Sequence, residues 1–276
     1  MDSYTAAPGV EVITSNFPIP GYGFVPINAF VLRGTEPILV DTGSVVDRAQ
    51  FLPALRKVID PGDLRWLYLT HTDPDHIGSL TQLVSENPRL RVITTFLGLG
   101  IMSLQAPLPM DRVYLLNPGE TLALSDRTLT CLRPPVYDNP STTCFYDDRT
   151  RILFSADCFG ALLADPAPHS AAELKENVLR DGQHLWATID SPWLHKVKLD
   201  NQSMELDLIR RMAPALILSS HLPAASAALT DRMLSNLAGA PGSAPFIGPN
   251  QAGLQKMLEQ LSPIHAVPES HPPHSG

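Results

Sequence analysis

Cysteine is scarce in this sequence, and the pattern of the few that occur is informative. Cys131, Cys144 and Cys158 are the three cysteines in 276 residues, and no two of them form a C-x-x-C pair. An odd number at wide spacing is typical of reduced thiols rather than of a disulfide framework. We interpret all three as buried apolar residues and predict that the protein is cytoplasmic.

Positive charge and long apolar runs are also lacking. Lysine and arginine number 20 against 28 aspartates and glutamates, and no basic run occurs, which argues against a nucleic-acid partner. The first fifteen residues have neither the basic start nor the apolar core of a signal peptide. No apolar run approaches the roughly 20 residues that span a bilayer. We therefore expect neither nucleic acid nor membrane among the partners.

What is present is a regular alternation of apolar strands and helical spacing, typical of an α/β protein. Apolar residues make up 44% of the chain, enough for a substantial core. We predict strands over 9–19, 27–34, 37–43, 64–71, 90–96, 111–117, 120–135 and 214–221, and a hairpin over 142–157. We predict helices over 45–59, 77–87, 171–186, 200–213, 227–237 and 250–261. We expect one domain over 1–262 and a disordered Pro- and His-rich tail over 263–276.

The segment LYLTHTDPDHIGSL, residues 67–80, carries the densest group of polar residues. His71, Asp73, Asp75 and His76 follow directly after an apolar strand. Open sheets hold their sites at the carboxyl ends of their strands. The first two residues and the last two diverge, which favours two metal ions side by side. The alternative is that Asp75 caps the next helix and the histidines are incidental.

Acids and a histidine also end three other predicted strands. Asp41 follows ILV, Asp157 follows ILFSA, and His221 ends LILSSH. A single acid after a strand is usually a cap or a turn, but four strand ends that carry acids and histidines indicate one shared site. We expect Asp41 to orient a ligand histidine without touching metal, the alternative being a plain turn in DTG.

In this order, ILVDTG, LTHTDPDHIG, LFSADCFG and LILSSH resemble the metallo-β-lactamase superfamily, over about residues 9 to 261. The resemblance implies an αββα sandwich, two mixed β-sheets flanked by helices, with a dinuclear metal site. Most of the superfamily has H-x-H-x-D-H, whereas this chain has Asp73 at the second histidine. That departure resembles the flavodiiron and oxygen-binding di-iron branch, which has H-x-E-x-D-H. The third histidine of that branch falls on Asp138 in YDNPS, a second departure.

The resemblance implies two metal sites and a bridge between them. Their ligands would be His71, Asp73 and Asp138 for the first metal, Asp75, His76 and His221 for the second, and Asp157 for both. Because Asp138 is a mismatched residue, a Tyr137 phenolate or a water molecule in its place stays open. For Asp157 and His221 the alternatives are a capping acid and a core histidine.

The carried-over ligand set also bears on the metal. Four carboxylates and a bridging hydroxide would hold five negative charges, which two zinc ions do not balance and a mixed-valence or ferric iron pair does. Zinc prefers nitrogen-rich sets, whereas carboxylates suit iron and manganese. We therefore expect two iron ions, with manganese and then zinc as alternatives.

Iron predicts oxygen chemistry, whereas zinc would predict a hydrolase. We expect a non-haem di-iron oxygen-binding protein or oxidoreductase acting on dioxygen or a small-molecule substrate. The alternatives are a metal-dependent hydrolase of a small ester, lactone or thioester, a non-catalytic oxygen sensor, and a di-iron oxygenase. The flavodiiron branch takes electrons from an attached flavodoxin-like domain. This chain ends at Gly276 without a glycine-rich flavin-binding loop, so we expect no flavin within it and a separate electron donor. The branch also suggests a homodimer.

The segment 160–198, before the last histidine, is expected to cover the site. His195 and Tyr137 are our candidate catalytic residues, as proton donors to reduced oxygen, and packing is the alternative for both. Trp186 and Trp193 could wall off a small gas-binding pocket.

Overall fold

A computed structural model describes residues 1–261 of the chain. The chain divides into two compact units, Met1–Pro245 and a second that begins at Phe246 and contains helix α7 (Gln251–Leu261). The predicted disordered tail, 263–276, lies outside the described residues, and the predicted single domain stays a prediction. None of the helices in the described part is both long and apolar enough to cross a bilayer.

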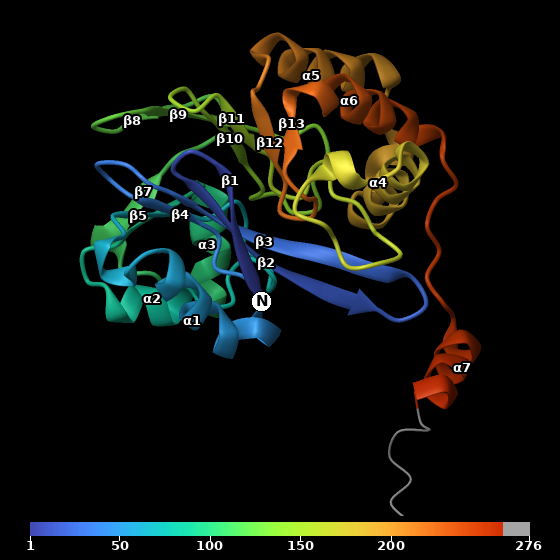
Figure 1. Cartoon of the computed structure of the whole chain (residues 1–276), viewed down its shortest axis with the longest axis horizontal. Coiled ribbons are helices and arrows are strands. Elements are labelled where there is room, and N and C mark those ends of the chain that lie inside the picture. The colour runs from blue at the N-terminus through green and yellow to red at the C-terminus, as the bar shows by residue number, and fades with distance from the viewer. Residues whose placement is uncertain (262–276) are drawn as a thin grey trace, which may run out of the picture. The chain divides into compact units, whose positions relative to one another are not determined.

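The first unit contains two β-sheets that face each other (Figure 1). The first sheet has the strand order β1 (Asp2–Ala7), β2 (Val10–Ile19), β3 (Gly23–Leu32), β4 (Ile38–Val40), β5 (Trp66–Tyr68), β6 (Arg91–Thr94) and β7 (Val113–Leu115). The second has the order β13 (Ala225–Ser226), β12 (Leu216–Leu218), β11 (Ile152–Phe154), β10 (Cys144–Asp147), β9 (Thr128–Leu132) and β8 (Thr121–Ala123). Strands β4 to β7 pair in parallel, as do β11 and β12, and the other neighbours are antiparallel. Both sheets are therefore mixed.

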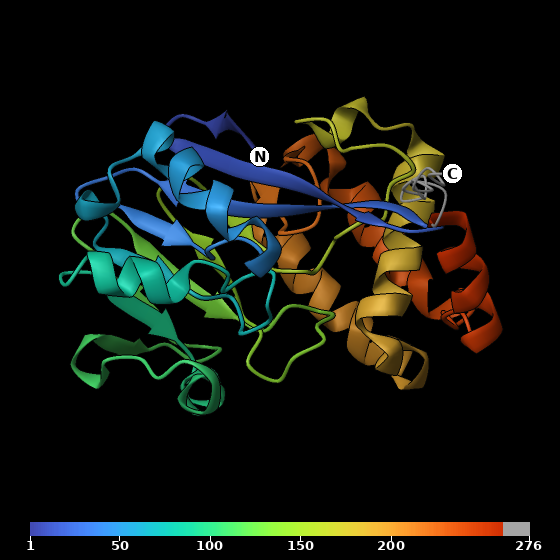
Figure 2. The same ribbon diagram turned by 90° about the horizontal axis from the view of Figure 1, so that it is seen from below.

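Helices flank both sheets on their outer faces (Figures 1 and 2). The first sheet packs against α1 (Arg48–Val58), α2 (Leu80–Glu86) and α3 (Phe96–Gln105). The second packs against α4 (Glu176–Asp190), α5 (Leu199–Met212) and α6 (Thr230–Gly239). Short 3-10 turns join these elements: η1 (Val45–Asp47), η2 (Pro61–Asp63), η3 (Met110–Arg112), η4 (Ala171–Glu173), η5 (Pro192–Lys196), η6 (Ala227–Leu229) and η7 (Ala240–Gly242).

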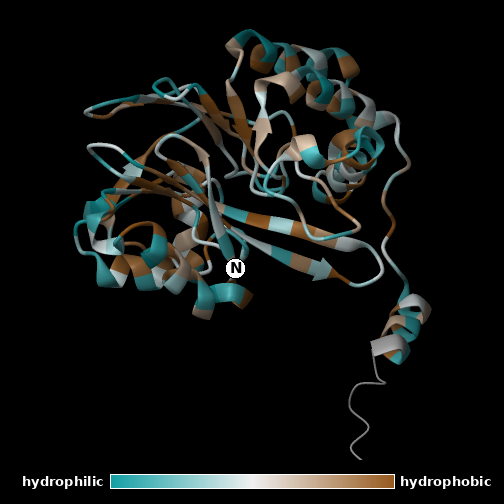
Figure 3. Ribbon diagram, in the orientation of Figure 1, coloured by the Kyte–Doolittle hydropathy of each residue, from teal (hydrophilic) through white to brown (hydrophobic). Residues whose placement is uncertain are grey.

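Three apolar layers hold this arrangement together. Phe30, Phe145 and Phe154 pack between the two sheets, while Phe51 and Met233 belong to the layers under the first and second sets of helices. Each such side chain contributes about 1.5–3 kcal/mol by its burial. Figure 3 shows apolar residues in brown along the strands of both sheets. The predicted αββα sandwich is confirmed.

Helix α3 is an element that the sequence analysis missed. The predicted strand 90–96 ends early, and α3 begins at Phe96 because the Thr95 hydroxyl accepts a hydrogen bond from the Gly98 amide at 2.9 Å. Glycines in FLGLG lower the helix propensity and obscured the signal.

Helix α4 is shifted from its predicted position. It was expected over 171–186 and spans Glu176–Asp190, because the first predicted turn forms the separate η4, closed by a capping box between Ser170 and Glu173. The shift brings Asp190 into the helix.

Candidate metal centre

Four strand ends meet at one edge of the sandwich, as the sequence predicts. Asp41 follows β4, the His71–His76 loop follows β5, Asp157 follows β11, and His221 follows β12. Strain marks this edge: Asp41, Ala156 and Phe159 are non-glycine residues with φ of 57°, 52° and 68°. Left-handed backbone at such residues persists only where the surroundings enforce it, and it clusters at functional sites.

Each of the three histidines is fixed through its Nδ1 atom. His76 Nδ1 donates to Asp41 Oδ2 at 2.9 Å, and His221 Nδ1 donates to the Pro26 carbonyl at 2.8 Å. His71 Nδ1 lies 3.1 Å from the Thr70 hydroxyl, which itself donates to Asp41 at 2.7 Å and so accepts from the histidine. Metal-binding histidines are typically held in this way. One ring nitrogen, here Nδ1, donates a hydrogen bond to the protein, and the other, Nε2, is left to bind the metal.

The three Nε2 atoms converge on Asp157. They lie 3.2 Å (His71), 3.1 Å (His76) and 3.0 Å (His221) from its oxygens, and all four side chains are almost completely buried. The Nε2 atoms of His71 and His76 and the Oδ1 atom of Asp157 have no hydrogen-bond partner within residues 1–261. Buried polar atoms without partners are rare and need an explanation. A cation between them supplies one.

The structure brings all seven predicted ligands together in overlapping groups. Within each group the ligand atoms lie within 4.8 Å of one another. The groups are His71, Asp73 and Asp138; Asp75, His76 and His221; and His71, His76 and Asp157. Because Asp157 lies against histidines of both triplets, the donor set fits two metal ions that share one carboxylate.

Charge interactions at the site are strong. Burial disfavours the charged form of Asp157, but the three neighbouring histidines outweigh it and hold its pKa well below the usual range. Burial likewise opposes the charged form of His76, while Asp75 and Asp157 raise its pKa well above the usual range. The pKa of Asp75 is lowered, because His76 and His221 outweigh its burial. Without metal, protonated histidines would compensate part of the carboxylate charge at these distances, although three of the atoms have no hydrogen-bond partner within residues 1–261.

Asp138 lies at the open side of the centre. Its side chain is exposed, and its nearest donor is the Thr142 hydroxyl at 3.4 Å. Burial of its carboxyl oxygens and the charge of Asp157 raise its pKa to about 6. Asp73 is better held, because the Asn139 amide donates to it at 2.8 Å. Asp138 is therefore the most exposed of the seven predicted ligands.

Of the two predicted catalytic residues, Tyr137 directly precedes Asp138, whereas His195 contacts the protein away from the grouped ligand atoms. The Tyr137 ring packs on Trp193 with 5.2 Å between ring centroids, and the Arg133 guanidinium lies 5.1 Å from the tyrosine ring. His195, on η5, places its Nδ1 3.2 Å from the Pro241 carbonyl. A catalytic role for Tyr137 or His195, and Tyr137 as a ligand, stay predictions.

A tryptophan covers His221, as expected for the segment 160–198. Trp186 donates from its indole nitrogen to the Asp157 carbonyl at 3.1 Å, and its ring centroid lies 4.5 Å from that of His221. Gly160 makes this approach feasible, because a Cβ there would lie 2.5 Å from the indole nitrogen and 2.8 Å from the His221 Cβ.

The alternative reading of Asp75 as a helix cap is wrong. Helix α2 begins at Leu80 after the N-cap residue Ser79. Asp75 instead places a carboxylate oxygen 3.5 Å from the Nε2 atoms of both His76 and His221.

Sequence reasoning missed Asp190, the last residue of α4. One of its oxygens lies within 4.8 Å of ligand atoms of Asp138 and Asp157. Burial, followed by the charges of Asp157 and Asp138, raises its pKa to about 8. A signal was available, because Gln183 and Ala187 lie seven and three residues earlier on the buried face of the helix. An acid in register with buried residues is a candidate site residue.

Comparison with known proteins gives a consistent picture. Residues 25–221 match a family model described as "ODP family beta lactamase". Among curated proteins, diflavin flavoprotein A 1 of Synechocystis sp. is 31% identical over 134 residues, 48% of this chain and 23% of that protein. The type A flavoprotein fprA of Rhodobacter capsulatus is 28% identical over 141 residues, 50% of this chain and 32% of that protein. The chain thus matches a quarter to a third of these relatives' length.

Solved structures share the fold. The rubredoxin oxygen:oxidoreductase of Desulfovibrio gigas superposes with a TM-score of 0.76 at 19% identity, covering 89% of this chain and 63% of that one. The flavodiiron protein of Giardia intestinalis gives a TM-score of 0.76 at 16% identity, covering 87% and 59%. The solved structures confirm the fold, while the family model and the curated relatives confirm the predicted resemblance to the metallo-β-lactamase superfamily and its flavodiiron branch.

Proposed function

Because this chain belongs to the family described as ODP family beta lactamase, we propose that it holds two iron ions and acts as a di-iron oxidoreductase on dioxygen with external electrons. The observation that carries the proposal is the donor set at the four strand ends. Three histidine Nε2 atoms and four carboxylates face one another in groups of 4.8 Å or less, and three of these atoms are buried without a hydrogen-bond partner.

The carboxylates favour iron over zinc. Asp73 supplies an oxygen where most of the superfamily has a nitrogen, and Asp138 supplies another. Oxygen-rich sets suit iron and manganese, whereas catalytic zinc prefers nitrogen. A bound iron pair would supply one-electron chemistry and an affinity for dioxygen. Relatives named as flavoproteins and an oxygen oxidoreductase support this reading.

The chain's own residues would position and shield this chemistry. Asp157 would hold the two metals together, because both triplets meet at its carboxylate. Asp41 and the Pro26 carbonyl keep His76 and His221 in the tautomer that leaves Nε2 free. Trp186 keeps bulk water away from His221. We propose Tyr137 and His195 as proton donors, and an electron-donor protein or small reductant as the partner.

Metal content and oxygen consumption test the proposal. The protein is produced in iron-supplied, zinc-poor medium, and metals per chain are measured together with the visible spectrum. We expect about two iron atoms per chain and ferric absorption bands that change on reduction and on exposure to dioxygen. A chemical reductant should then drive oxygen uptake that the metal-free protein lacks.

Other outcomes identify the alternatives. Two zinc ions per chain under these conditions, with hydrolysis of model esters or thioesters, would overturn the proposal in favour of a hydrolase. Two iron ions that bind dioxygen reversibly without turnover would leave an oxygen sensor instead.

A further inference from the structure

Asp190 adds a fifth carboxylate to the metal centre, and none of the predicted ligand sets includes it. We propose that Asp190 is a ligand of the first metal, the one held by His71, Asp73 and Asp138. The inference rests on the two-metal centre proposed above. Its basis is that ligand oxygens of Asp138, Asp157 and Asp190 lie within 4.8 Å of one another, and Asp157 Oδ1 is buried without a hydrogen-bond partner.

The protein itself supplies little to compensate Asp190. Within residues 1–261 its carboxylate accepts a hydrogen bond from the Ser191 hydroxyl at 3.1 Å, and the charge of His221 is a minor compensation that does not outweigh the charges of Asp157 and Asp138. Among residues 1–261, no lysine or arginine forms an ion pair with Asp190 or Asp138. A partly buried carboxylate facing two others is costly unless a cation lies among them. By contrast, the buried Asp147 of β10 has the Arg127 guanidinium at 3.2 Å.

The helix that carries Asp190 aims it inward. Leu179, Gln183 and Ala187 are buried on α4 at spacings of four residues, and Asp190 follows three residues later on the same face. This face is otherwise apolar or hydrogen-bonded within the protein: the Gln183 amide donates to the Phe159 carbonyl at 3.0 Å. Glu176 begins this face at the far end of the helix, where it is exposed and paired with Arg232 at 3.5 Å, whereas Asp190 lies at the end nearest the metal centre.

The grouping of ligand atoms selects the first metal. Asp190 groups with Asp138 and with the shared Asp157, and Asp138 groups with His71 and Asp73. Asp190 shares no group with Asp73, Asp75 or any of the three histidines, so its link to the first metal runs through Asp138.

The two metals would then differ in their ligands. The first would have one histidine nitrogen and oxygens from four carboxylates, whereas the second would have two histidine nitrogens and oxygens from two. Five carboxylates and a bridging hydroxide would carry six negative charges, which two ferric ions balance. An oxygen-rich first site should therefore select a hard, trivalent cation more strongly than the second.

Substitution of Asp190 tests the assignment. Asp190→Asn and Asp190→Ala are loaded with ferrous iron and, separately, with zinc, and release of each metal to a chelator is followed with time. If Asp190 is a ligand, one of the two metals should be released about 10–100-fold faster and the other at the unchanged rate. Release of both metals at unchanged rates in both variants would overturn the assignment.

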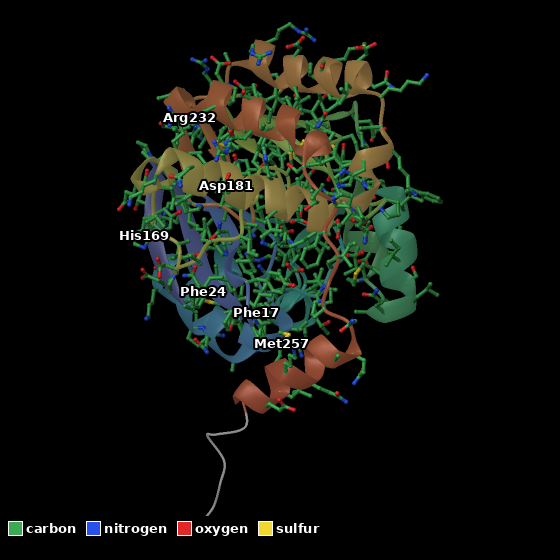
Figure 4. The ribbon with its side chains drawn as sticks, turned by 90° about the vertical axis from the view of Figure 1, so that its right-hand side faces the viewer. Phe17, Phe24, His169, Asp181, Arg232 and Met257 are labelled. Carbon is green, nitrogen blue, oxygen red and sulfur yellow. The ribbon has the colours of Figure 1, made fainter. Side chains whose placement is uncertain are left out.

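Asp181→Asn is the matched control. Asp181 is an exposed acid of the same helix, paired with Arg180 at 2.8 Å and labelled in Figure 4. It lies nine residues before Asp190, so at 3.6 residues per turn the two carboxylates are on opposite faces. Its loss should leave the release of both metals unchanged. Equal effects of the Asp181 and Asp190 substitutions would show a general charge effect and overturn the assignment.

A second measurement needs no substitution. In a crystal of the unchanged, metal-loaded chain, an Asp190 oxygen should lie about 2.0–2.2 Å from the first metal. A separation beyond about 3 Å, well outside that bonding range, would overturn the assignment even if the variants fail to fold. Failure of the proposed function would be seen in the unchanged protein, as zinc occupancy or absent oxygen uptake. The Asp190 assignment is judged separately, from the metal–oxygen distance and the metal release rates.

Discussion

The two halves of the predicted metal centre differ in how the protein holds their ligands. The second half consists of Asp75, His76 and His221. Both of its histidines are 1% exposed, and each donates a hydrogen bond from Nδ1 to a protein oxygen. In the first half, Asp73 is half-buried, and Asp138 is exposed and accepts a long hydrogen bond of 3.4 Å from the Thr142 hydroxyl. The second half therefore has two histidines that are fixed before any metal arrives and one half-buried carboxylate, Asp75. The first half has one such histidine, His71, and depends more on carboxylates, of which Asp138 is exposed.

This difference predicts that the two metals would have different roles. A ligand set that is fixed in advance holds its metal tightly and changes little during reaction. An exposed carboxylate would leave room for a small molecule beside it. If the centre holds two metals as proposed, we therefore expect a small molecule to approach on the side of Asp138. The following variants test this comparison.

Removing the shared carboxylate should have the largest effect. Asp157 contacts the histidines of both halves. Asp157→Ala should therefore weaken both metal sites, and the variant should lose more than one metal per chain. Metal analysis after desalting, with circular dichroism to confirm the fold, measures this. Asp165→Ala, an exposed acid eight residues later, is the control and should keep both metals. A normal metal pair in the Asp157 variant would show that it is not the bridge.

Substitution of Asp138 should affect the first metal alone. Asp138→Ala should loosen the first metal while Asp75, His76 and His221 keep the second. Asp138→His should keep both metals and raise the reduction potential, because a neutral nitrogen stabilises the ferric state less than a carboxylate does. Chelator release and a spectroscopic redox titration measure the two effects. If Asp138→Ala changes neither metal content nor spectrum, Asp138 is not a ligand and the first metal has an open position.

Substitution of Asp41 should affect mainly the second metal, and to a smaller extent than the changes above, because Asp41 holds His76 directly and His71 only through the Thr70 hydroxyl. Its carboxylate accepts from the Thr70 amide at 2.8 Å, the Thr70 hydroxyl at 2.7 Å and His76 Nδ1 at 2.9 Å. Asp41→Asn tolerates the φ of 57° but puts an amide where His76 needs an acceptor. Affinity for the second metal should fall about 10–100-fold, as for other partners of metal-binding histidines.

Competition with a coloured chelator measures the Asp41 effect. Thr35→Ala, an exposed change in the loop before β4, is the control. A variant that loses the first metal before the second would contradict the comparison between the halves.

The difference between the halves also explains what the sequence could predict. His71, Asp157 and His221 follow apolar strands, and parallel strands bring such ends to one edge, so periodicity and motif order sufficed. Asp190 was missed because its placement depends on where α4 ends, and the start of that helix is set by a local capping box. The tautomer set by the Pro26 carbonyl depends on a contact across 195 residues of chain, which no local pattern encodes.

A carboxylate that accepts several hydrogen bonds from the protein should contribute to stability without any metal, unlike the carboxylates at the first metal. Glu36 accepts hydrogen bonds from the Trp66 indole at 2.8 Å, the Ser125 amide at 3.0 Å and the Ser125 hydroxyl. The hydroxyl and then the indole lower the pKa of Glu36, so its contribution to stability is present at neutral pH and is lost as pH falls through the lowered pKa. Glu36→Gln should therefore cost about 1 kcal/mol at pH 7.

This cost should be independent of the metal centre. A loss of that size lowers the melting temperature by about 2–4 °C, and the difference should be the same with and without metal. In the metal-free protein it should shrink between pH 7 and an acidic pH below the lowered pKa of Glu36, because the wild-type carboxyl is then also protonated. Thermal melts followed by circular dichroism at both pH values measure it. A difference that persists undiminished at low pH would mean that Glu36 acts through packing, and one that appears only with metal bound would mean that the two regions are coupled.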